Sequence, residues 1–135
     1  MARIVFGVFV VLHGLVHLLY FGQSARYFEL QPGMVWPDGS WAISRFLGDE
    51  AARKLASVLL VVAAAGFVAG GAGVLVKQAW WRPVMGVVAM FSSAGYVLFW
   101  DGAWQKLHDK GAIGILINVA LLAAVLVSRW PHLGI

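Results

Sequence analysis

Residues 3–22 read RIVFGVFVVLHGLVHLLYFG, and this apolar stretch decides the fold of the chain. An α-helix of about 20 apolar residues is long enough to cross the hydrocarbon core of a membrane. Arg3 is the only charged residue in the stretch. His13 and His17, one helical turn apart, are therefore expected at membrane depth, where a polar group needs a partner or water. The stretch predicts a membrane-spanning helix that carries two histidines on one face.

The composition is that of a small membrane protein with one domain. Of the 135 residues, 61% are hydrophobic and 12% are charged, whereas soluble domains carry about 25% charged residues. The net charge is +4, but the ten Lys and Arg are scattered singly, so no basic patch indicates a nucleic-acid partner. The chain has no cysteine, which excludes disulfides, thiolate metal sites and iron–sulfur clusters.

Three more apolar stretches follow the first, at residues 52–76, 84–100 and 112–128. Together the four predict an all-α fold, an integral membrane antiparallel four-helix bundle that occupies residues 1–135 as a single transmembrane domain. The longer loop between the first two spans, residues 23–48, is rich in turn formers and aromatic residues. Within it, residues 40–47 are expected to form a short helix in the membrane interface.

The distribution of charge gives an expected orientation. An even number of spans places both termini on one side together with the connection at residues 77–82. That side holds only basic residues, and all six acidic residues fall on the other. Because the numbers of Lys and Arg on the two sides are nearly equal, the orientation rests on net charge. We expect a multi-pass protein of the inner (plasma) membrane with both termini in the cytoplasm.

The second span contains rows of small residues at four-residue spacing. Gly66 and Gly70 form one row, and Ala65, Ala69 and Gly73 form another beside it. Such rows let helices approach closely in a membrane. We therefore expect Gly66, Gly70 and Gly73 to pack helices, either within the bundle or in a homo-oligomer.

The polar side chains inside the spans are few, and several fall at similar depth. His17, Tyr96 and Asn118 come from three different helices, and Asp101 stands at the end of the third span. We expect these four side chains to converge in the outer half of the membrane. The remaining polar residues of the spans are His13, Ser57, Ser92 and Ser93.

Two interpretations of this convergence stay open. In one, an outward-opening pocket covered by residues 36–41 takes the polar head of an amphiphilic ligand such as a quinone or a membrane lipid. In the other, the same residues hydrogen bond across helices and hold the bundle together. The residues predicted to line the pocket are His13, His17, Tyr20, Tyr96, Trp100, Asp101, Trp104 and Asn118.

The same residues leave other functions open. No metal site is expected, since His13 and His17 lack the glutamate of HExxH and no other span carries a histidine. A membrane enzyme would use His17 with Asp101 or Tyr96 as acid and base on a lipid. A proton-coupled transporter would normally need a carboxylate at mid-depth, and the four spans have none. A structural homo-oligomer is the remaining alternative.

Several residues of the first span resemble the first helix of the DoxX-like membrane proteins. They are Arg3, Gly7, His13-Gly14-Leu15, Leu18 and Phe21-Gly22. The resemblance implies a four-helix inner-membrane bundle, and some relatives are associated with quinone-linked oxidoreductase complexes. It therefore implies an accessory subunit with a protein partner. The usual lysine of the family is His17 here, and the acidic residue of the family's second helix has no counterpart in this sequence. The resemblance therefore assigns a role only to His13 and Gly14.

Overall fold

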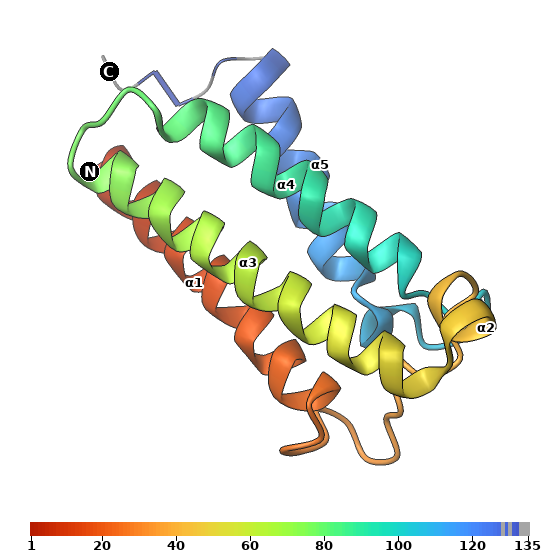
Figure 1. The fold of residues 1–135 in the computed structure, drawn as a ribbon. Helices are drawn as coiled ribbons and strands as arrows, with labels where there is room; N and C mark the ends of the chain where they lie inside the picture. Colours follow the sequence, from red (N-terminus) through yellow and green to blue (C-terminus); the bar gives the residue numbers. More distant parts are fainter. Residues whose placement is uncertain (128, 130, 133–135) are drawn as a thin grey trace.

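Four main helices build the protein. The computed structural model describes residues 1–127, 129, 131 and 132, with residue 109 described by its backbone alone. The described residues contain no strand, and the main helices pack antiparallel (Figure 1). They are α1 (Ala2–Ser24), α3 (Asp49–Leu75), α4 (Trp81–Leu98) and α5 (Ala112–Leu122). Shorter elements are the helix α2 (Ile43–Leu47), the 3-10 turn η1 (Leu107–Lys110) and the π-helical turn η2 (Ala123–Val127).

The helix boundaries agree closely with those predicted from the sequence. The first three predicted spans end within three residues of α1, α3 and α4 at either side. The fourth begins at Ala112 as predicted, but its last turns change to the π-helical η2. Its predicted final residue, Ser128, lies outside the described residues. The short interfacial helix is also present as α2, where Ser40 Oγ accepts from the backbone N–H groups of Ile43 and Ser44.

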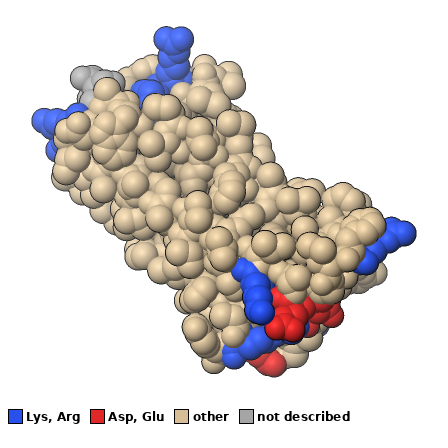
Figure 2. Space-filling view, viewed as in Figure 1, with Lys and Arg blue, Asp and Glu red and all other residues tan. Residues whose placement is uncertain are grey.

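The helices pack in chain order, and the two ends of the bundle differ. α1 packs against α3, α3 against α4, and α4 against α5. The N-terminus, the α3–α4 connection and η2 lie at one end, which we call the terminal end (Figure 1). The segments 25–48 and 99–111 lie at the other, which we call the loop end. On the face shown in Figure 2, basic residues occur at both ends, and acidic residues occur only at the loop end.

Glycines allow α1 and α3 to come into close contact. A Cβ added at Gly71 of α3 would stand 2.8 Å from the carbonyl oxygen of Gly7 in α1. A Cβ at Gly14 would stand 2.7 Å from the Cβ of Phe67. Real side chains do not tolerate such distances from backbone or Cβ atoms, so these positions require glycine.

The glycines predicted to pack helices face α4 instead. A Cβ at Gly66 would meet Val88, and a Cβ at Gly73 would meet Trp80 and Trp81. Gly70 is more loosely packed, because its nearest neighbour would be the Cε of Met85 at 3.5 Å. Gly66, Gly70 and Gly73 thus pack inside the chain, whereas Ala65 and Ala69 of the predicted rows are exposed. The helix α3 lies between α1 and α4 as the central helix.

Two helices are long and apolar enough to cross a membrane, by length and composition. These are α1 with 23 residues and α3 with 27. α4 has 18 residues but does not reach the same hydropathy, and the apolar helix Ala112–Val127 is shorter still. The structure therefore supports two of the four predicted spans by this measure.

Candidate functional site

Four polar side chains form a closed ring of hydrogen bonds inside the bundle. His13 Nε2 lies 2.8 Å from Asn118 Oδ1, and Asn118 Nδ2 lies 3.0 Å from Ser92 Oγ. Ser92 Oγ lies 2.7 Å from His17 Nε2, and His17 Nδ1 lies 2.9 Å from the His13 carbonyl oxygen. All four side chains are buried. We call this set the polar ring.

The partners fix the direction of each hydrogen bond in the polar ring. The carbonyl of His13 can only accept, so neutral His17 donates from Nδ1 and accepts at Nε2 from the Ser92 hydroxyl. Ser92 Oγ then accepts from the Asn118 amide, whose oxygen accepts from His13 Nε2. With both imidazoles neutral, every bond of the ring has one donor and one acceptor. The ring therefore joins α1, α4 and α5.

Aromatic side chains connect the polar ring to the loop end. The Tyr96 ring centroid lies 5.9 Å from that of His17 and 6.0 Å from that of Trp36. Tyr20 packs edge-on against both Tyr96 and Trp36, at 5.4 Å in each case. These three residues fill the space between the ring and the loops.

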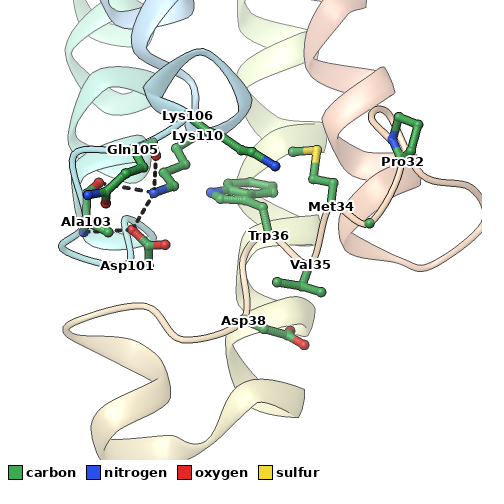
Figure 3. A pocket seen from close by; sticks show the side chains of 11 residues that line it. Pro32, Met34, Val35, Trp36, Asp38, Asp101, Ala103, Gln105, Lys106 and Lys110 are labelled. Carbon is green, nitrogen blue, oxygen red and sulfur yellow. Dashed lines mark hydrogen bonds and ion pairs between the residues drawn. The ribbon is translucent and has the colours of Figure 1, made fainter.

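A pocket of about 320 Å³ lies beyond this aromatic cluster, at the loop end. One wall comes from the segment after α1, and the other comes from the segment after α4 (Figure 3). The first wall is apolar except for Asp38, and the second carries charged or amide side chains except for Ala103. The pocket is lined by Pro32, Gly33, Met34, Val35, Trp36, Asp38, Asp101, Ala103, Gln105, Lys106 and Lys110. We call it the loop-end pocket.

The first wall is held in place by two residues near the end of α1. Gln23 is fully buried, and its Nε2 donates to the carbonyl oxygens of Met34 and Trp36. Arg26 donates to the Trp36 carbonyl at 3.0 Å and pairs with Asp38 at 2.8 Å. These bonds place Trp36 beneath the loops although the segment has no regular structure of its own.

Trp36 presents an unused hydrogen-bond donor at this pocket. It is 6% exposed, and its Nε1 is buried with no partner in the described part of the chain. In Figure 3 the Nε1 edge of the indole is turned toward Lys110 and Gln105. Four buried polar side-chain atoms among the described residues lack a partner, and Trp36 Nε1 is the one that lines this pocket. Because buried donors are nearly always bonded, its position favours an incoming acceptor.

The structure divides the residues predicted from the sequence between these two places. His13, His17 and Asn118 belong to the polar ring, while Asp101 lines the loop-end pocket and pairs with Lys110 at 3.0 Å. Tyr96 and Tyr20 lie between them, and the Tyr20 hydroxyl donates to the His108 carbonyl. Asp101 thus does not join His17, and the expected single cluster is two clusters.

The two tryptophans predicted to line the pocket, Trp100 and Trp104, are placed differently. Trp100 Nε1 donates to the Ala103 carbonyl at 2.8 Å, which shapes the turn that carries Asp101. Trp104 packs edge-on against Trp100, is 74% exposed, and does not line the pocket. Trp41, in the segment expected to cover the pocket, donates from Nε1 to the Val97 carbonyl.

Three important residues were not among those predicted to line the site. Ser92 closes the polar ring, and Lys106 and Lys110 line the loop-end pocket. Ser92 and Ser93 are recognisable in the sequence as polar residues inside an apolar span. The rotation of the helix about its own axis decides which of the two serines faces inward. The lysines lie in an irregular segment whose path the sequence does not specify.

Comparisons with known proteins do not identify the chain. No family model, no curated protein and no solved structure matches the chain. Among the described residues, no group of three or more His, Asp or Glu side chains could hold a metal ion.

Proposed function

We propose that this chain is an integral membrane protein that binds the polar head of an amphiphilic molecule in its loop-end pocket. Membrane embedding is supported by the surface of the middle of the bundle, where large apolar side chains face outward on every main helix. Charged side chains gather at the two ends of the face in Figure 2. Exposed examples, one from each of α1, α3, α4 and α5, are Leu12, Val58, Val87 and Leu116. In water such a surface would be costly, and in lipid it is the expected one.

The observation that carries the ligand proposal is the unpartnered Nε1 of Trp36. A carbonyl or other acceptor oxygen on the ligand would satisfy this donor. Lys106 lines the same pocket and would favour an electron-rich or anionic head. The ring of a quinone, with a carbonyl at each end, has this chemistry.

A second, smaller cavity offers a path for the apolar tail. It has a volume of about 240 Å³ and is lined by Tyr20, Leu30, Gln31, Met34, His108 and Ile113. Met34 lines both cavities, so they adjoin at this residue. Tyr20 and Ile113 belong to α1 and α5, so the tail would leave between these helices toward the surrounding lipid.

The role of an accessory subunit in a redox or lipid process remains a proposal. It is supported by the resemblance of the His13-Gly14-Leu15 stretch to the DoxX-like proteins. The enzyme alternative finds less support, because His17 is bonded to Ser92 and His13 while Asp101 is paired with Lys110. Neither residue is placed to act on the other.

Native mass spectrometry of the detergent-purified protein with added decylubiquinone tests the proposal. We expect a one-to-one adduct that Trp36→Phe weakens about fivefold, as the loss of one hydrogen bond implies. Trp104→Phe is the matched control, because Trp104 does not line the pocket, and it should bind as the unaltered protein does. No adduct, or an equal adduct in Trp36→Phe, would contradict the proposal.

A further inference from the structure

A long apolar groove runs along the outside of the bundle between α1 and α5, in the half nearer the terminal end. Its volume is about 750 Å³. Phe6 and Leu121 form its buried floor, and Val5 and Phe9 stand exposed along the α1 side. Ala120 and Ala124 line the α5 side with only methyl groups, which keeps the groove open. The polar ring closes the bundle between the same two helices further along, through His13 and Asn118.

The end of the molecule where the groove opens is basic. It carries the amino group of Met1, which lines the groove, together with the side chains of Arg3, Lys77, Arg82 and Arg129. All six acidic residues lie between residues 29 and 109, in the loop-end segments or the first turn of α3. The terminal end therefore presents positive charge that no carboxylate side chain within this end balances.

We propose that the groove holds one acyl chain of an anionic phospholipid from the leaflet at the terminal end. The chain would cover Phe6 and Leu121, and the basic end would attract the phosphate head. Each basic residue near a membrane surface favours an anionic lipid about fivefold. The inference rests on the membrane embedding proposed above, but not on the loop-end pocket.

Charge also argues against a second copy of the chain as the occupant. Two copies inserted in the same orientation would meet along this groove with their basic ends side by side. Like charges at such an interface repel each other, whereas an anionic lipid head neutralises them. The same positive charge thus disfavours the copy and favours the lipid.

The test is native mass spectrometry of the full chain with phosphatidylglycerol and phosphatidylcholine of identical acyl chains. We expect the phosphatidylglycerol adduct of the unaltered protein to exceed the phosphatidylcholine adduct about fivefold or more. Ala120→Phe should remove this adduct because the ring fills the groove. Ala123→Phe is the matched control, since Ala123 is exposed and does not line the groove, and it should keep the adduct.

A pair of charge variants tests the head group separately. Arg129→Gln at the terminal end should lower the phosphatidylglycerol adduct about fivefold. Lys54→Gln, which removes an exposed lysine near the loop end, should leave it unchanged. If Ala120→Phe does not fold, Ala124→Phe one turn further along the groove makes the same test.

Three results would overturn the inference. They are equal adducts of the two lipids, a full adduct in the groove-filling variant, and a dimer that this variant converts to a monomer. The last would assign the groove to a second copy. Decylubiquinone binding is measured in a separate experiment. A negative result with phosphatidylglycerol therefore does not contradict the loop-end pocket, and a negative result with decylubiquinone does not contradict the lipid groove.

Discussion

His13 Nε2 and Asn118 Oδ1 lie 2.8 Å apart and join α1 to α5, two helices that share few other contacts in the described structure. Consecutive main helices pack directly on one another, so this bond closes the bundle between the first and the last of them. Its two residues are 105 positions apart in the sequence. Both are buried, so breaking the bond would leave a donor and an acceptor without water.

Ser92→Ala tests how much the polar ring stabilises the fold. The change removes the acceptor of Asn118 Nδ2 and the donor to His17 Nε2. We expect the free energy of unfolding in detergent to fall by about 1–2 kcal/mol. Ser93→Ala is the matched control, because the Ser93 hydroxyl is buried with no partner among the described residues. It should leave the stability unchanged or slightly higher, and equal losses in both variants would contradict the ring.

The protonation pattern of the ring is a second prediction. Neutral His17 should carry its proton on Nδ1, and neutral His13 should carry its proton on Nε2. Nitrogen NMR of histidine-labelled protein distinguishes the two tautomers directly. Ser92→Ala should leave both tautomers unchanged, because the His13 carbonyl still accepts from His17 Nδ1 and Asn118 still accepts from His13 Nε2. The same tautomer for both imidazoles would refute the direction we assign to the bonds.

Neighbouring glycines of α3 should differ sharply in their tolerance of alanine. Gly71→Ala would push a Cβ to 2.8 Å from the Gly7 carbonyl oxygen, which is backbone and cannot move aside. We expect a loss of roughly 2 kcal/mol, the usual cost of overpacking. Gly70→Ala places its Cβ 3.5 Å from Met85, an ordinary contact, and should be neutral. Thermal unfolding in detergent measures both, and a neutral Gly71→Ala would refute the close α1–α3 contact.

Much of the fold was predictable because helix length and turn chemistry are local properties. The spans, the short helix near residues 43–47 and the central position of α3 all follow from apolar runs, turn residues and small-residue rows. The glycines that touch α1 were harder to identify. Gly7 meets Gly71 and Gly14 meets Phe67, and nothing in the sequence marks Gly71 rather than Gly70 as the partner of Gly7.

The site was predictable only in part, because the depth of a residue in the membrane does not fix the direction in which its side chain points. His17 and Asn118 are placed at similar depth by the sequence, and they do share the polar ring through Ser92. Asp101 has a similar expected depth, but it stands in a turn and pairs with Lys110. The path of an irregular segment depends on bonds such as those of Gln23, which join residues with no local signature.

The embedding of four helices is the central claim, and labelling of single cysteines in intact cells tests it most directly. The natural chain has no cysteine, so Arg45→Cys at the loop end and Gln78→Cys at the terminal end can be compared without background. A maleimide that does not cross membranes should label Arg45→Cys from outside, and Gln78→Cys only after permeabilisation. Labelling of both positions from the same side, or recovery of the chain without detergent in the soluble fraction, would contradict the account.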